Sequence, residues 1–173
     1  LTTMLIVSMA STIFLKKNLD DDVAEFRQLE TEKAKQNLKG YVEIALILID
    51  KARSAAERGE ISREEARKEA AAQIEQLRWD GGTGYIWIND TTRPIPRMIM
   101  HPTLPELNGR VLNDPKFNWA LGRQENLFVA MVDESSVGGE GYVDYLWPKP
   151  TKDGLTSDQP KLSYVKRYEP FGW

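Results

Sequence analysis

Residues 84–109 read GYIWINDTTRPIPRMIMHPTLPELNG, and here the chain changes from helical to strand-like patterning. Tyr85 and Trp87 alternate with two isoleucines, the period-two pattern of a β-strand with aromatic side chains on one face. A second alternating run ends at His101, the only histidine of the chain. The residues between the runs include two prolines and predict a hairpin-like connection. His101 is therefore a candidate catalyst, metal ligand, pocket residue or buried structural residue.

Upstream of this stretch the pattern is helical. From residue 20 to residue 56 there is no proline and one glycine, and apolar residues between Leu38 and Ala52 recur at steps of three and four. Gly59 ends this long helix, and Ser62 with Glu65 forms a capping-box sequence. The sequence therefore predicts a long helix followed by a short one, which ends at a glycine-rich turn before the first strand.

Downstream, residues 114–138 look partly helical, and residues 142–147 and 161–168 predict two further strands. The segment between these strands, PKPTKDGLTSDQP (148–160), predicts a Pro- and Gly-rich hairpin loop. Helices first and strands afterwards predict an α+β fold. In such a fold an antiparallel sheet packs one face on the long helix.

Composition limits the functional classes. The chain has 173 residues, a formal net charge of −3 and no cysteine, so disulfides and thiolate metal sites are excluded. No global positive field favours nucleic acid. There is no G-x-S-x-G motif, and the glycine clusters at 81–84 and 138–141 lack the Lys-Ser/Thr of a phosphate-binding loop. Paired carboxylates for glycoside hydrolysis stay open, because the sequence does not show their separation. We predict no catalytic residue, metal, cofactor or nucleic-acid partner.

The first fifteen residues, LTTMLIVSMASTIFL, carry no charge, and charged residues follow at once. A buried helix, an amphipathic anchor and the end of a transmembrane helix all fit this run. The abrupt change to charged residues favours the last, although a full span needs ~20 residues. The abrupt end at YEPFGW suggests a piece of a longer protein. We expect residues 1–15 to be the end of a transmembrane helix and residues 16–173 to form one domain.

The predicted strands gather residues that suit a small-molecule pocket. Aromatic walls exclude water, and a Lys, Arg or His head group supplies a charge-assisted hydrogen bond to a small carboxylate. The competing interpretation is that each aromatic ring only fills the core and each lysine is solvated. The grouping, rather than any one residue, favours a pocket. Its candidates are Tyr85, Trp87, His101, Tyr145 and Trp147, with Lys149 and Lys161 nearby in the sequence.

Four segments in order, GYIWIND, MIMHPTLPELNGR, GEGYVDYLWPKP and QPKLSYVKRYEPFGW, resemble the successive motifs of single Cache sensor domains of type 2. The resemblance covers residues 40–173. Such domains are extracytoplasmic sensors of bacterial chemotaxis receptors, histidine kinases and cyclic-dinucleotide enzymes. The resemblance implies a PAS-like fold, with a long N-terminal helix behind an antiparallel sheet and a ligand pocket on the opposite side. It also implies a small carboxylate ligand such as acetate, propionate, pyruvate or lactate.

The same resemblance implies which residues meet the ligand. Four aromatic residues would form the pocket walls, and His101 and Lys161 would be the polar heads toward a carboxylate. The sequence departs from the common pattern at TTRPIPR (91–97), and this insert would bring Arg97 to the pocket. The family's final strand and second transmembrane helix would follow residue 173. The implied ligand-binding set is Tyr85, Trp87, Arg97, Met100, His101, Tyr145, Trp147, Lys161 and Tyr164.

These observations predict a periplasmic ligand-binding sensor domain of a bacterial inner-membrane signalling protein. Ligand binding would bias its long helix and so pass a displacement to an output domain, such as a kinase or cyclase. The domain itself is not expected to be an enzyme. We expect a homodimer that pairs through the N-terminal helix. The alternative is a helical dimerisation module that binds no ligand.

Overall fold

The computed structural model describes residues 2–120, 122 and 124–173, with side chains described from Lys16 onward. The chain divides into two compact units, Leu1–Leu38 and Lys39–Trp173. The predicted membrane segment, residues 1–15, lies outside the residues whose side chains are described. Across the part that is described, no helix combines the length and the apolar character needed to cross a bilayer.

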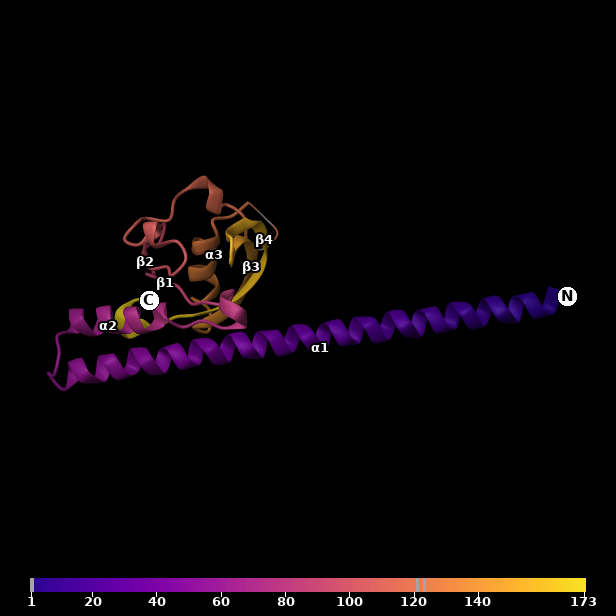
Figure 1. The fold of residues 1–173 in the computed structure, drawn as a ribbon, viewed down its shortest axis with the longest axis horizontal. Coiled ribbons are helices and arrows are strands. Elements are labelled where there is room, and N and C mark those ends of the chain that lie inside the picture. The colour runs from indigo at the N-terminus through magenta and orange to yellow at the C-terminus, as the bar shows by residue number, and fades with distance from the viewer. Residues whose placement is uncertain (1, 121, 123) are drawn as a thin grey trace. The chain divides into compact units, whose positions relative to one another are not determined.

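Two helices run side by side in the larger unit. α1 (Thr2–Glu57) enters this unit at Lys39, and α2 (Arg63–Glu75) doubles back along its C-terminal turns (Figure 1). The predicted capping box is confirmed: Ser62 Oγ accepts the Glu65 amide hydrogen at 3.1 Å, and Glu65 accepts the Ser62 amide hydrogen at 2.8 Å. Small and apolar residues fill the contact between the helices: Ala45, Ile49, Ala52, Ala66, Ala70 and Ile74.

The first two strands are shorter than the alternation predicts. β1 (Ile88–Asn89) pairs antiparallel with β2 (Met98–Met100), and the register shifts within β1. The link between them contains two prolines, which have no amide hydrogen for a ladder. The Asp90 carboxylate instead accepts the Arg97 amide hydrogen at 2.7 Å. The link is hairpin-like, as predicted, but the YIW segment (85–87) precedes β1 and belongs to no strand.

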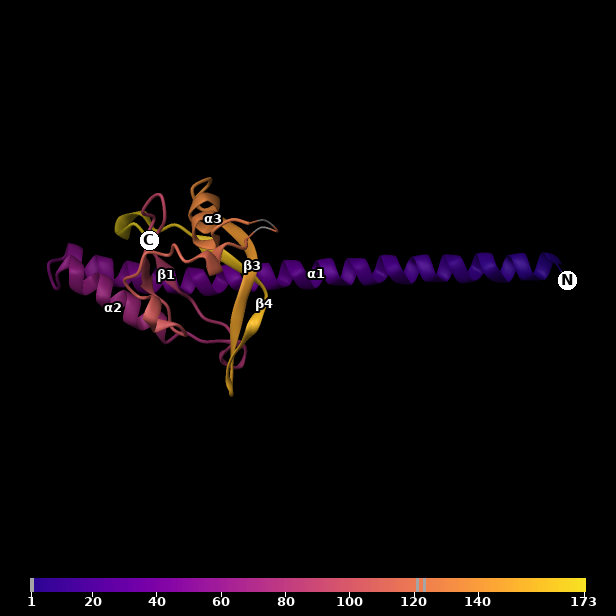
Figure 2. The ribbon, with the colours of Figure 1, turned by 90° about the horizontal axis from the view of Figure 1, so that it is seen from above.

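A helix and a long hairpin follow. α3 (Leu127–Glu134) begins at Asn126, whose side-chain oxygen accepts amide hydrogens of the first turn. β3 (Glu140–Thr151) pairs antiparallel with β4 (Gly154–Lys166), and Figure 2 shows them as a long twisted ribbon with α3 beside it. α3 packs against β3, and this contact places the helix over one face of the hairpin.

The segment 148–160 differs from its prediction as a loop. Most of it belongs to β3 and β4, which pair up to Thr151 and Gly154. Its prolines are tolerated because a two-stranded ribbon has two open edges, where a missing amide hydrogen costs little. The ladder accommodates them with a register shift between Pro148 and Pro150.

The core has two parts. One lies between the two helices and the β1–β2 pair and includes Ile88 and Met100. The other lies between α3, β3 and the chain from Leu107 to Ala120. The expected α+β fold with antiparallel strands is confirmed, but the described strands form two two-stranded sheets rather than one continuous sheet.

Candidate ligand-binding pocket

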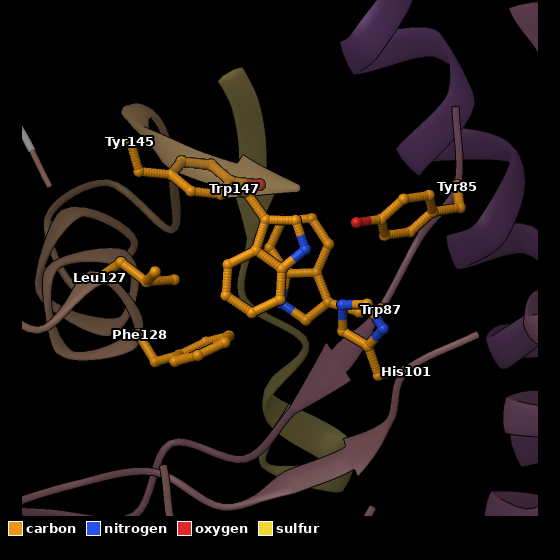
Figure 3. Close-up of a pocket in the computed structure, with 7 residues that line it drawn as sticks. All are labelled: Tyr85, Trp87, His101, Leu127, Phe128, Tyr145 and Trp147. Atoms are coloured by element: carbon orange, nitrogen blue, oxygen red, sulfur yellow. The ribbon is translucent and has the colours of Figure 1, made fainter. Parts of the chain in front are cut away.

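A small cavity lies between α3, the β3–β4 hairpin and the YIW segment. The side chains around it lie close together, and the space that they leave is too small for a water molecule. Figure 3 shows the rings of Trp147, Tyr85 and His101 converging from one side and α3 closing the other. The lining is almost entirely apolar and aromatic, as in most small-molecule sites. The lining residues are Tyr85, Trp87, His101, Leu127, Phe128, Tyr145 and Trp147.

Strand alternation explains how the hairpin supplies its part of the wall. Tyr145 and Trp147 are each 6% exposed, whereas the intervening Leu146 is 36% exposed. These two rings define the inner face of the hairpin, which is turned toward the cavity. Lys161 is the cross-strand partner of Tyr145, so its side chain lies on the same face. The Tyr145 hydroxyl makes a hydrogen bond of 2.9 Å with the buried Ser163 hydroxyl. The inner face therefore carries two aromatic rings and one ammonium group.

Ring contacts hold the walls together. The Trp147 ring lies 5.6 Å from the His101 ring and 5.9 Å from the Phe128 ring, measured between centroids. The Tyr85 ring meets the His101 ring edge-on at 5.3 Å. Edge-to-face and tilted contacts of this kind stabilise aromatic clusters beyond the area they bury. Trp147 thus joins the two sides of the cavity.

His101 is neutral, and its proton position follows from its contacts. The ring is 2% exposed, and its Nδ1 accepts backbone amide hydrogens from Thr103 at 3.3 Å and Leu104 at 3.1 Å. Nδ1 is therefore the acceptor, and Nε2 carries the hydrogen. Burial, and then the positive charges of Lys161 and Arg78, lower the pKa of His101 to about 3. His101 is thus a neutral hydrogen-bond donor across the physiological pH range.

The buried ammonium of Lys161 has no counter-ion in the part of the chain that the structure describes. Its Nζ lies 3.9 Å from the centroid of the Tyr85 ring and has no hydrogen-bond partner among the described residues. The ring face attracts the ammonium, but it does not replace the hydrogen bonds lost from water. Burial, and then repulsion from Lys149, lower the pKa of Lys161 to about 8. An anion beside Tyr85 would supply the missing partner.

Five of the nine predicted ligand-binding residues line the cavity, namely Tyr85, Trp87, His101, Tyr145 and Trp147. Lys161 adjoins it through its contact with the Tyr85 ring. The structure therefore brings together the aromatic walls and both predicted polar heads. Their contact with a ligand stays a prediction.

The other three predicted residues lie away from the cavity. Arg97 is exposed and donates to the Gly109 carbonyl, so the TTRPIPR insert does not bring it to the pocket. Met100 packs into the core beside the helices, because it directly precedes His101 and points to the other face. Tyr164 lies on the outer face of β4 and donates to Glu140 at 2.7 Å.

Leu127 and Phe128 were missed by the sequence reasoning. Both are 2% exposed, and both come from the first turn of α3. Their apolar spacing predicts only a helix face in the core. No local pattern shows that this face meets the hairpin, because the contact joins distant parts of the chain.

A metal centre has no support in the described part of the chain, where no group of three or more His, Cys, Asp or Glu side chains converges. His101 has its Nδ1 occupied by backbone amides. The pocket is thus equipped to bind a small molecule through apolar walls, one neutral donor and one ammonium.

Comparison with known proteins identifies the family of the chain. The family model described as "Cache domain" matches residues 14–173. The chain is similar to the methyl-accepting chemotaxis protein McpP of Pseudomonas putida, with 36% identity over 118 residues, or 66% of this chain. The match covers 19% of that protein, so the chain spans about a fifth of the length of this curated relative.

Two solved structures are similar in fold and sequence. The periplasmic sensor domain of a chemotaxis protein superposes with a TM-score of 0.66 at 41% identity, covering 79% of this chain and 88% of that one. A Cache chemosensory domain described for its carboxylic acid recognition superposes with a TM-score of 0.68 at 31% identity, covering 86% of this chain and 91% of that one. The family match, the fold and the shared sequence agree, and this chain belongs to the Cache domain family as a single Cache sensor domain.

Proposed function

We propose that this chain is the periplasmic sensor domain of a bacterial inner-membrane chemoreceptor and that it binds a small carboxylate in the aromatic pocket. Family membership and the chemoreceptor relative support a sensor that is not itself an enzyme. One similar Cache domain is described for carboxylic acid recognition. The ligand proposed here is a monocarboxylate of about two to four carbons, such as acetate, propionate or pyruvate.

The observation that carries this proposal is the buried ammonium of Lys161, which finds no hydrogen-bond partner among the described residues. A buried charge without a partner is costly, and a carboxylate would give it a charge-assisted hydrogen bond. The neutral His101 offers Nε2–H to the second carboxylate oxygen. The aromatic rings would accept the short alkyl part once the side chains that line the pocket move apart to admit it.

We further propose that binding is signalled through α1. The larger unit ties the hairpin to this helix at two levels. Glu140, at the start of β3, accepts from Lys39 of α1 at 2.6 Å. Beyond β4, the Tyr168 hydroxyl donates to Asp50 of α1 at 2.6 Å. A ligand that draws Lys161 and Trp147 together would move β3 and β4, and with them the contacts of Glu140 and Tyr168 with α1. Binding would then shift α1, provided that the ligand binds one helix arrangement better than the other.

Membrane anchoring and dimerisation belong to the same proposal. Residues 1–15 would be the end of a transmembrane helix, and residues 16–173 the sensor domain. In the smaller unit, α1 exposes apolar side chains at steps of three and four, which is the pattern of a helix that pairs with a second helix. We therefore propose a homodimer through this stripe, formed by Leu19, Val23, Phe26 and Leu29.

A thermal-shift series tests the ligand. Acetate, propionate, pyruvate and butyrate are added to the purified chain at neutral pH, with uncharged amides of the same size as controls. A ligand at 100-fold its Kd stabilises by about 2.7 kcal/mol, or roughly 5–10 °C for a chain of this length. A rise with carboxylates but not with amides is expected. Equal melting temperatures in all of them would refute carboxylate binding.

The exposed stripe also favours the alternative, a dimerisation module that binds no ligand. That module would melt at a temperature that rises with protein concentration, and no carboxylate would change it. Replacement of Phe26 by Lys would remove the concentration dependence. If the chain is a ligand sensor, a carboxylate should still raise the melting temperature of the Phe26→Lys variant.

A further inference from the structure

The surroundings of Lys161 are those of a nucleophilic amine. Lysine becomes nucleophilic when it is desolvated in an apolar pocket or lies near another cation, and Lys161 meets both conditions. Its Nζ is buried without a partner among the described residues, and Lys149 of the same hairpin opposes its charge. Both effects favour the neutral amine, whose lone pair attacks carbonyl carbon atoms.

The ionisable groups near this amine come from the hairpin, from the segments before β1 and after β2, and from just beyond the end of α2. The hairpin contributes Lys149 and the protonated Tyr145, and the segment after β2 contributes the neutral His101. The segment before β1 contributes Tyr85, whose pKa is raised by burial, and Arg78 follows α2 and acts on both Tyr85 and His101. None of these five groups is an anion that would hold the proton on Lys161.

We propose that Lys161 forms a reversible imine with the carbonyl group of a short 2-oxo carboxylate bound in the pocket. This proposal rests on the proposed carboxylate-binding function and adds a covalent mode for one class of ligand. Saturated acids bind through the ammonium form of Lys161. Oxo acids bind first through the same carboxylate contacts, and the neutral fraction of Lys161 then attacks their carbonyl group while His101 Nε2–H holds the carboxylate.

The reaction balances without an oxidant or a reductant. The Nζ lone pair forms a bond to the carbonyl carbon, and the C=O π pair moves to oxygen. A proton passes from nitrogen to that oxygen and gives a carbinolamine. The hydroxyl group then takes a second proton and leaves as water, and nitrogen loses its remaining proton as the C=N bond forms. Amine and ketone become imine and water, and the reverse reaction releases the ligand.

The neutral fraction distinguishes Lys161 from ordinary lysines. With a pKa of about 8, roughly a tenth of Lys161 is neutral at pH 7, which is roughly 200-fold more than for a lysine with a pKa of about 10.4. Imine formation therefore becomes faster as pH rises from 6 to 8. Binding of saturated acids, which needs the ammonium, does not strengthen over this range.

The test is reductive trapping with pyruvate as the probe. The intact chain is incubated with pyruvate and cyanoborohydride at pH 7.5, digested, and mapped by mass spectrometry. We expect the mass of one reduced pyruvate unit at Lys161, at least about tenfold above Lys149 and Lys152 in the same digest, given its larger neutral fraction. Excess propionate should suppress this adduct. Lys161→Arg, which keeps the charge but offers no amine, should abolish it.

The outcomes separate this proposal from carboxylate binding. If pyruvate and propionate both raise the melting temperature but no adduct forms at Lys161, the imine is refuted and the binding function stands. The imine is also refuted if Lys161 is labelled no more than Lys149 and Lys152. The same holds if propionate does not suppress the labelling of Lys161. If no carboxylate binds and no adduct forms, both proposals fail. The propionate competition uses the unaltered chain, so it decides the matter even if Lys161→Arg does not fold.

Discussion

The two faces of the β3–β4 hairpin carry similar residue types in opposite environments. On the outer face, Glu140 accepts from Lys166 and Tyr164, each at 2.7 Å, and from Lys39 of α1 at 2.6 Å. These contacts lower the pKa of Glu140 to about 2. On the inner face, Lys161 is buried with no partner among the described residues. The outer charges are matched within the protein, and the inner charge is the one to which we assign a ligand.

The difference separates a charge that the fold itself satisfies from one that we propose serves binding. Glu140 is partly exposed, and its partners within the protein satisfy it. Lys161 destabilises the fold by its burial and gains only the Tyr85 ring. Stability alone does not explain an ammonium at this position, which is why we propose that it meets an anion.

The largest effect is expected from Lys161→Met, which keeps the side-chain length and removes the charge. Loss of a charge-assisted hydrogen bond worth about 1.5–3 kcal/mol should weaken carboxylate binding by roughly 10–150-fold. The unliganded protein should become more stable by roughly 1–3 kcal/mol, since one pKa unit corresponds to about 1.4 kcal/mol. Calorimetric titration and thermal melting measure the two effects.

The control for this variant is Lys152→Met, at the exposed tip of the hairpin. It should change neither affinity nor stability measurably. If Lys161→Met binds as tightly as the unaltered chain, or melts at a lower temperature, the inner lysine is structural and the contrast between the faces fails.

The second effect concerns pH. Carboxylate binding needs the Lys161 ammonium, whose pKa is about 8 in the free protein, so affinity should fall by up to about tenfold per pH unit above pH 8. Between pH 5 and 7 it should stay level, because His101 has a pKa of about 3 and remains neutral. Titrations with acetate from pH 5 to 9.5 measure this profile. A fall in affinity between pH 5 and 7 would show that His101 titrates instead.

The unliganded protein should show the opposite trend. The pKa of Lys161 is lower in the folded chain than in the unfolded chain, so the unfolded state binds more protons between pH 8 and 10.5. Stability contributed by this group therefore rises with pH in that window. Urea unfolding of the unaltered chain and of Lys161→Met isolates the contribution, since the variant lacks it.

A smaller effect is expected from Leu127→Ala at the α3 side of the cavity. Leu127 lines the space into which the alkyl chain would extend. Its truncation should shift the preferred acid toward longer chains, by roughly tenfold in relative affinity. Met131→Ala is the matched control, since Met131 lies on the same helix and is equally buried but does not line the cavity. The same shift in both variants would indicate general loosening of the core.

The smallest effect on binding is expected from Glu140→Gln on the outer face. Three donors lose their charged acceptor, so the melting temperature should fall by roughly 2–4 °C at neutral pH, while the acetate Kd should stay within about twofold. Because the Glu140 pKa is depressed to about 2, its contribution is present above pH about 4.5 and is lost as pH falls toward 2. A large change in Kd would place the outer cluster in the binding site.

Much of the fold and of the candidate site could be predicted from local patterns. The capping box at Ser62 and the alternation around Tyr145 are set by residues close in sequence, and both hold in the structure. The same alternation separates Lys161 from Tyr164, since an odd spacing in a regular strand places two side chains on opposite faces. The sequence thus already contained the reason why Tyr164 lies outside the cavity.

The remainder depends on contacts that no local pattern encodes. The register shift within β1 breaks the alternation from which the faces of β1 and β2 are predicted. Leu127 and Phe128 face the cavity only because α3 packs on β3. The absence of a partner for Lys161 among the described residues is a property of the whole fold, because it depends on every element packed around that amine.

The most direct test of the central claim is the number of protons taken up when acetate binds. Calorimetric titration at pH 8 in two buffers of different ionisation enthalpy measures this number. If the carboxylate pairs with Lys161, its pKa of about 8 rises, and roughly half a proton should be taken up per acetate at pH 8 and almost none at pH 6. Binding at pH 8 without proton uptake, or with the same uptake in Lys161→Met, would contradict the claim that the unpaired inner lysine is the carboxylate anchor.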